Sequence, residues 1–209
     1  MSEVQLGKKM IAAETGLGLT SLRNGTLAEN DWYTLHAGIG GLTTAPIYID
    51  DTAALKIFEI KAKLRRLKYE NDALGMVIVD YLQLIDGTNP SNKGQNREQQ
   101  ISYISRSLKA IAKELNVPVI ALSQLSRSVE SRGGDKRPML SDLRESGAIE
   151  ADADMVLFVY RPEYYDIFED AEGADIRGQA QLIIAKHRNG ALADVKLRFE
   201  GARSRFSNL

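Results

Sequence analysis

The sequence predicts an α/β fold with a mainly parallel central sheet. Four apolar, strand-like segments each deliver a polar residue where they end, and they span residues 76–80, 118–124, 154–161 and 179–188. An amphipathic helical pattern separates the first two segments. Strand, long helix and strand in this order form a right-handed crossover between parallel strands. Because the carboxyl ends of parallel strands meet at one edge of a sheet, we expect the polar residues to gather there.

Length and composition favour one domain over residues 1–209. Hydrophobic residues make up 44% of the chain, which is enough for a core. The 27 Lys and Arg nearly balance the 28 Asp and Glu, so contact with nucleic acid would need local patches. Without cysteine, and with two histidines, the chain offers neither disulfides nor a credible zinc site. It shows no membrane span and no signal peptide, which favours the cytoplasm.

The first third of the chain is predicted to be mainly helical. An amphipathic helix is expected over 4–14, and Thr26 with Glu29 matches a capping box that opens a second helix. This helix should end at the glycines 38, 40 and 41. Glycines 16 and 18 are likewise interpreted as a turn or helix end, because no strand precedes them. Residues 45–49 alternate like a strand, and a helix with an apolar stripe and a basic outer face follows.

From residue 76 onward the hydrophobic period changes. The continuous apolar run 76–79 is typical of a parallel strand buried on both faces. A helix over 96–115 and a strand over 118–122 follow it. Further strands are expected at 154–160, 181–185 and 194–199, and a turn at Arg188, Asn189 and Gly190 joins the last two as a hairpin. Two long irregular segments, 86–96 and 127–141, are predicted to be functional or mobile loops.

Two polar residues at strand ends indicate a nucleotide site. Asp80 follows four apolar residues, which is the arrangement of a Walker B carboxylate that holds Mg²⁺ through its water shell beside phosphates. In roughly half of such matches the aspartate merely ends a strand. Gln124 ends the next strand, and its amide would sense a terminal phosphate if the two strands are neighbours. Considered without Asp80, Gln124 is interpreted as an ordinary surface glutamine.

A pair of cations ends a later strand. Lys186 and Arg188 alternate, so both point to one side and His187 points to the other. With no acidic partner nearby in sequence, they would form a finger that reaches a phosphate on an adjacent subunit. The alternative is a solvated basic edge that prevents aggregation, and His187 is assigned to that alternative.

The segment 141–147 is a candidate for contact with DNA. Ser141 is expected to cap a helix, and Arg144 with the backbone amides near Gly147 would hold a DNA phosphate. Nothing in the segment reads bases, so binding would be independent of sequence. No stretch of the chain reads G-x-x-x-x-G-K-[ST], the loop that holds nucleotide phosphates.

Several long strings occupy residues 79–84, 105–109, 118–127, 136–147 and 185–190. In these strings, and over nearly its whole length, the chain resembles the bacterial DnaB-type replicative helicases. The resemblance implies a RecA-like motor fold, without its amino-terminal strands and its phosphate loop. It also implies a ring-shaped homohexamer that hydrolyses ATP with Mg²⁺ and moves 5′ to 3′ along single-stranded DNA at the replication fork. Primase and a helicase loader are the implied partners.

The resemblance also implies roles for individual residues. Asp80 matches the Walker B aspartate, Gln124 matches the phosphate-sensing glutamine, and Lys186 with Arg188 matches the pair donated to the neighbouring subunit's nucleotide. The residues that match the loop holding DNA phosphates in the central channel are Arg144, Glu145 and Gly147.

The amino end departs from the family pattern. Family members carry a serine-leucine-glutamate string before Met-Ser, whereas this chain begins at Met1 and Ser2. We therefore expect it to start one residue after the catalytic glutamate and to hydrolyse no ATP alone. Two alternatives stay open. One is a non-catalytic remnant that binds DNA or docks on intact helicase subunits through Lys186 and Arg188, and the other is a RecA-like recombination or repair ATPase.

Overall fold

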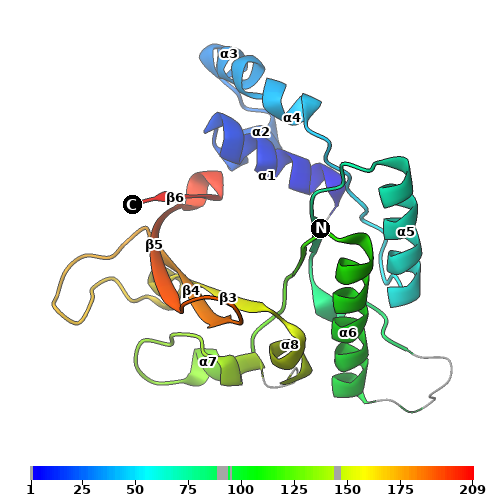
Figure 1. The fold of residues 1–209 in the computed structure, drawn as a ribbon. Helices are drawn as coiled ribbons and strands as arrows, with labels where there is room; N and C mark the ends of the chain where they lie inside the picture. Colours follow the sequence, from blue (N-terminus) through cyan, green and yellow to red (C-terminus); the bar gives the residue numbers. More distant parts are fainter. Residues whose placement is uncertain (1, 89–93, 95, 144–146) are drawn as a thin grey trace. The chain divides into compact units, whose positions relative to one another are not determined.

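A computed structural model describes residues 2–88, 94, 96–143 and 147–209 (Figure 1). The expected combination of helices and strands is present. Internal contacts divide the chain into two compact units. The first comprises Met1–Asp51, Arg161–Leu182 and Val195–Leu209, and the second comprises Thr52–Tyr160 and Ile183–Asp194. The expectation of one domain over residues 1–209 stays a prediction.

The first unit contains the helices of the amino-terminal region. They are α1 (Glu3–Thr15), α2 (Leu19–Asn24), α3 (Glu29–Gly38) and α4 (Gly40–Thr44). The predicted first helix is confirmed. Its start is a capping box, because Ser2 Oγ accepts from the Gln5 N–H at 3.3 Å and Gln5 Oε1 accepts from the Ser2 N–H at 3.2 Å. It ends at Gly16, whose φ of 74° suits a residue without a side chain.

Two predictions in this region were wrong. Thr26 does not open α3, because the Ala28 N–H donates to Asp31 Oδ2 at 3.0 Å and the helix begins at Glu29. Residues 45–49 form no strand, although their apolar residues alternate. The Ile47 N–H donates to the Ala45 carbonyl at 2.8 Å, a local bond that turns the chain instead of extending it.

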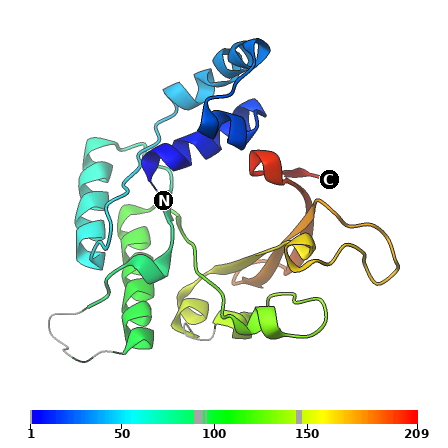
Figure 2. The same ribbon diagram turned by 180° about the vertical axis from the view of Figure 1, so that it is seen from behind.

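The core of the second unit lies between two helices and a parallel strand pair. Helices α5 (Ile57–Glu70) and α6 (Arg97–Leu115) lie side by side in both views (Figures 1 and 2). The predicted α6 is confirmed, with Asn96 Oδ1 accepting from the Gln99 N–H at 2.9 Å at its start. The buried side chains that pack together here are Ile57, Leu82, Ile85, Ile101, Ile104, Leu108 and Ile111.

The two strands of this unit that carry the predicted nucleotide residues are parallel neighbours. Strand β1 (Val77–Val79) pairs with β2 (Val119–Ala121), with Val77 opposite Val119 and Val79 opposite Ala121. The predicted parallel pairing of the strands on either side of α6 is therefore confirmed. The expected burial of both faces is not, because Val77 is buried whereas Ile78 is 64% exposed. The residues that the structure describes cover only one face of this pair.

A second sheet contains the remaining strands of the described chain. Its order is β3 (Met155–Tyr160), β4 (Gln179–His187), β5 (Ala193–Glu200) and β6 (Arg205–Asn208). The predicted strands are confirmed, and β4 and β5 are adjacent, as the predicted hairpin requires. Strand β6 was not predicted and pairs antiparallel with β5, with Phe199 opposite Phe206. Hydrogen bonding thus divides the expected central sheet into two.

In the turn between β4 and β5, a side chain at Gly190 would meet the imidazole ring of His187. A Cβ atom built at Gly190 would lie 2.2 Å from the imidazole ring of His187. The predicted turn at 188–190 therefore uses glycine for space.

None of the helices in the described ranges has the length and apolarity needed to cross a bilayer.

Candidate nucleotide site and its surroundings

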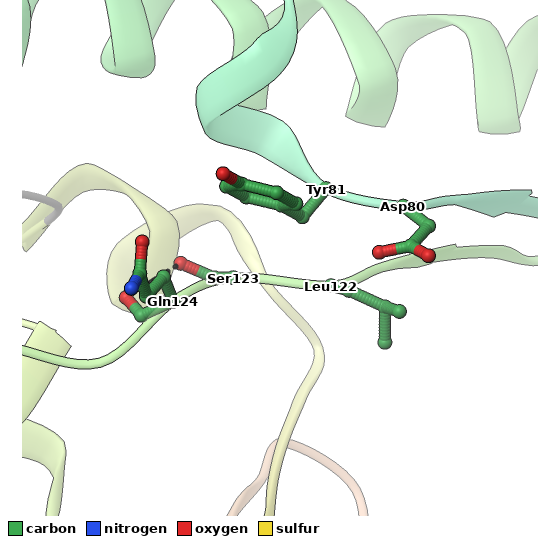
Figure 3. A pocket seen from close by; sticks show the side chains of 5 residues that line it. All are labelled: Asp80, Tyr81, Leu122, Ser123 and Gln124. Carbon is green, nitrogen blue, oxygen red and sulfur yellow. Dashed lines mark hydrogen bonds between the residues drawn. The ribbon is translucent and has the colours of Figure 1, made fainter. Parts of the chain in front are cut away.

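Asp80 and Gln124 line one open hollow where β1 and β2 end. The hollow has a volume of about 290 Å³ and is lined by Asp80, Tyr81, Leu122, Ser123 and Gln124. Figure 3 shows Asp80 and Gln124 at opposite ends of this group, with Leu122 and Ser123 between them. The Leu122 N–H donates to the Val79 carbonyl at 2.9 Å, so the pairing of the strands continues to the hollow. The two strands are neighbours, as the prediction for Gln124 required.

The carboxylate of Asp80 is exposed at this hollow. The peptide bond between Asp80 and Tyr81 is cis. Within the described ranges, no three Asp, Glu or His side chains cluster as a ligand set for a metal. Mg²⁺ is commonly bound through one or two carboxylates, several waters and the phosphates of a nucleotide. A single exposed carboxylate beside an open hollow fits that mode of binding, and Asp80 is the residue that would hold the ion.

Sequence reasoning missed Gln83, which bonds to the segment that carries Gln124. Gln83 Oε1 accepts from the Gln124 N–H at 3.3 Å, and Gln83 Nε2 donates to Ser123 Oγ at 3.0 Å. Gln83 belongs to the 3₁₀ helix η1 (Leu82–Leu84), which follows Asp80 directly. The only signal in the sequence was its place three residues after Asp80.

Lys186 and Arg188 lie against the end of a short helix, α8 (Gly147–Asp152). Lys186 Nζ donates to the Glu150 carbonyl, and Arg188 Nη2 donates to the Ala151 carbonyl at 2.9 Å. Cations are favourable at the carboxyl end of a helix, where carbonyl groups lack partners. The two cations thus share one side, as predicted, but neither is among the residues that line the hollow.

The sequence near these cations offers no acidic partner, but the structure supplies one from a distant position. Arg188 Nη1 lies 3.2 Å from Asp154 Oδ1, and Lys109 Nζ donates to Asp154 Oδ2. The hydrogen bond from Lys109 lowers the pKa of Asp154, and the positive charges of Lys109, Arg188 and Lys113 lower it further. Asp154 is 34 residues from Arg188 in sequence, so spacing alone did not reveal the pair.

A buried carboxylate organises the segment 127–141, which was predicted to be irregular but contains the short helix α7 (Ser128–Ser131). Asp142 is only 2% exposed; Arg132 Nη2 donates to its Oδ1, and the Met139 N–H donates to its Oδ2 at 2.8 Å. Ser141 lies inside the 3₁₀ helix η2 (Leu140–Leu143) and does not cap a helix as predicted. Of the predicted DNA residues, Gly147 begins α8, whereas Arg144 and Glu145 lie outside the described residues.

Comparisons with known proteins match the whole chain. Residues 1–208 match the model of the DnaB-like helicase C terminal domain. The chain is 52% identical over 209 residues to the replicative DNA helicase DnaB of Geobacillus stearothermophilus, and 51% identical to the replicative DNA helicase DnaC of Bacillus subtilis (strain 168). Each alignment covers 100% of this chain and 44% of the relative. The chain thus spans less than half the length of these relatives.

Solved structures share its fold. A DnaB-like replicative helicase, described with its interactions with primase, superposes with a TM-score of 0.90 at 40% identity, over 100% of this chain and 48% of that one. The ATPase domain of G40P superposes with a TM-score of 0.89 at 40% identity, over 100% of this chain and 72% of that one. The predicted α/β fold is confirmed.

Proposed function

The chain belongs to the family of DnaB-like helicase C-terminal domains, and on this premise we propose that it is part of a replicative DNA helicase. Such a helicase couples ATP hydrolysis to 5′ to 3′ movement on single-stranded DNA and to separation of the duplex at the replication fork. The observation that carries the proposal is the shared hollow at Asp80 and Gln124, where two parallel strands end.

Each residue of the hollow has a separate task in this proposal. Asp80 holds Mg²⁺ through water, and Gln124 contacts the terminal phosphate of ATP and reports its loss. Magnesium, when bound, neutralises charge on the phosphoryl group during transfer. The exposure of Asp80 and the openness of the hollow support this assignment, because an ion that keeps its waters needs room.

The other predicted residues act outside the hollow. Lys186 and Arg188 stabilise negative charge on the nucleotide of the neighbouring subunit in a homohexamer. The Arg188 side chain is 49% exposed and Lys186 is half-buried, so Arg188 has the freer access to a second chain. Arg144, Glu145 and Gly147 hold the phosphates of single-stranded DNA. Primase and a helicase loader are the proposed protein partners, and the cytoplasm is the proposed location.

ATP turnover and unwinding by the complete gene product that contains residues 1–209 test this function. A fork with a free 5′ tail should be unwound with ATP and Mg²⁺, whereas a fork with only a 3′ tail should not. Asp80→Asn should lower kcat by about 100-fold, because it removes the charge that holds the metal. The matched control is Asp72→Asn, an exposed carboxylate that pairs with Lys68 and should leave turnover unchanged.

Three outcomes would contradict the proposal. Unwinding with the opposite polarity would reject the assigned direction of movement. Wild-type turnover by Asp80→Asn would reject the metal site, and strand pairing without unwinding would favour a recombination ATPase. We expect residues 1–209 alone to hydrolyse no ATP, because no G-x-x-x-x-G-K-[ST] string occurs among them.

A further inference from the structure

We propose that Gln83 is a positioning residue that holds the backbone of Gln124 in place for contact with the nucleotide. The inference rests on the proposed function, because it assigns Gln83 a task at the same hollow. Gln83 itself is not among the residues that line the hollow, so it acts through Gln124.

The side-chain amide of Gln83 uses both of its ends on the segment that follows β2. Its oxygen accepts from the Gln124 N–H at 3.3 Å, and its nitrogen donates to Ser123 Oγ at 3.0 Å. These two bonds hold consecutive residues of that segment and set the orientation of the amide, since only one end can donate. Gln83 and Gln124 are 41 residues apart, so the bonds join the segment that follows β1 to the segment that follows β2.

Gln83 is itself fixed by its surroundings. Its neighbour Leu82 is 1% exposed in the core, and the Leu82 N–H donates to the Leu122 carbonyl at 2.9 Å. The carbonyl of Gln83 accepts from Arg97 Nη2 at 2.5 Å, and this bond connects η1 to the start of α6. The side chain therefore extends from an element that is held by core packing and hydrogen bonds, as a supporting group for a precise contact must.

Gln124 needs such support because regular pairing of β1 with β2 has ended before it. The ladder ends at the pair Val79 and Ala121, and Gln124 lies three residues beyond Ala121. Past that point, the acceptor of the Gln124 N–H is the side chain of Gln83 and not a backbone carbonyl of a neighbouring strand. A misplacement of about 1 Å in a group that contacts the reacting phosphate can slow a reaction up to about 100-fold.

The variants are chosen to separate position from stability. Gln83→Leu keeps the size of the side chain and removes both bonds. Gln83→Glu keeps the acceptor for the Gln124 N–H, and its second oxygen can accept from the Ser123 hydroxyl, so it should rescue the function. Gln100→Leu is the matched control, because Gln100 accepts from the same Arg97 at 3.0 Å but has no bond to Ser123 or Gln124.

In the complete gene product, Gln83→Leu should lower the kcat for ATP about tenfold and leave KM within about twofold. Gln83→Glu should stay within about threefold of wild type, and the control should match wild type. In a Gln124→Ala background, Gln83→Leu should cause no further loss, because its effect passes through Gln124. A merely structural role would lower turnover in both backgrounds by the same factor, and that result would overturn the inference.

Hydrogen exchange gives a readout that needs no activity. Loss of one hydrogen bond of ordinary strength should speed exchange of the Gln124 amide about fivefold in Gln83→Leu, with little change in the control. Unchanged exchange would reject the positioning role. If the wild-type protein shows no ATP turnover, the proposed function fails. If it turns over ATP and Gln83→Leu behaves like wild type, the inference fails alone.

Discussion

Arg188 and Asp154 form an ion pair between the residue after β4 and the residue before β3, with 3.2 Å between Arg188 Nη1 and Asp154 Oδ1. The second oxygen of Asp154 accepts from Lys109, and Arg188 also reaches the last turn of α8. A cation proposed to act on a nucleotide is therefore already engaged within its own chain. Contact with a phosphate would exchange these partners for a new one.

Acid should weaken the fold through Asp154. Its lowered pKa in the folded state means that its contribution to stability is complete above the ordinary pKa of an aspartate, and is lost as pH falls through the lowered value. Asp154→Asn should therefore lower the urea midpoint slightly at pH 7 and have no effect at pH values below the lowered pKa. The effect should be small, because the carboxylate is 58% exposed.

The matched variant for this prediction is Lys109→Met, which removes the main cause of the shift. It should reduce the same pH dependence, and the double variant should add little to either single one. An unchanged pH dependence of the urea midpoint in Asp154→Asn would show that other carboxylates control acid unfolding.

Asp142→Ala should destabilise the protein by about 3 kcal/mol, because it leaves Arg132 partly buried without its partner and removes the acceptor for the Met139 N–H. Asp194→Ala is the control, since Asp194 pairs with Arg137 at 52% exposure and its loss should cost below about 1 kcal/mol. Urea denaturation measures both changes. Equal losses would mean that Asp142 does not organise the segment 127–141.

Lys186→Ala with Arg188→Ala should lower ATP turnover of the complete gene product about 1000-fold, in the range known for arginine fingers. Rings mixed from these subunits and Asp80→Asn subunits should recover part of the activity. In such rings, a subunit with an intact Asp80 can lie next to a subunit that supplies intact Lys186 and Arg188. No recovery on mixing would place the cations and the metal site in the same subunit. Lys196→Ala, an exposed cation on β5, is the control.

Arg144→Ala should weaken binding of single-stranded DNA of every sequence to a similar extent. It should also reduce the slope of log affinity against log salt by about 1, as expected for the loss of one phosphate contact. Fluorescence anisotropy over a salt series measures both quantities. Arg66→Ala is a suitable control, because Arg66 is exposed and pairs with Glu70. A slope equal to that of wild type would remove Arg144 from the DNA site.

Local patterns predicted the elements whose partners are close in sequence. Asn96 and the apolar residues of α6 determine that helix within one stretch, so its bounds followed from the sequence alone. The parallel pairing of β1 with β2 could also be predicted from the sequence, because the hydrophobic period distinguishes the two strands from the helix between them. The capping box predicted at Thr26 was wrong because Asp31 accepts the hydrogen bond at the start of the same helix. The strand predicted over 45–49 was wrong because an alternating pattern does not supply a partner strand.

The contacts around the site were harder to predict, because they join distant parts of the chain. Gln83 meets Gln124 across 41 residues, and Lys186 meets the carbonyl of Glu150 across 36. No period in the sequence encodes such pairs. The strand ends indicated Asp80 and Gln124 only because parallel strands place their carboxyl ends together.

The tight turn after β4 predicts a pattern of joint variation at two positions. Gly190 lies so close to the ring of His187 that any side chain there requires the imidazole to rotate away. A residue larger than glycine at 190 should therefore be tolerated where position 187 carries a small side chain. His187→Ala should act as a suppressor of Gly190→Ala, so selection is expected to treat the two positions as one unit.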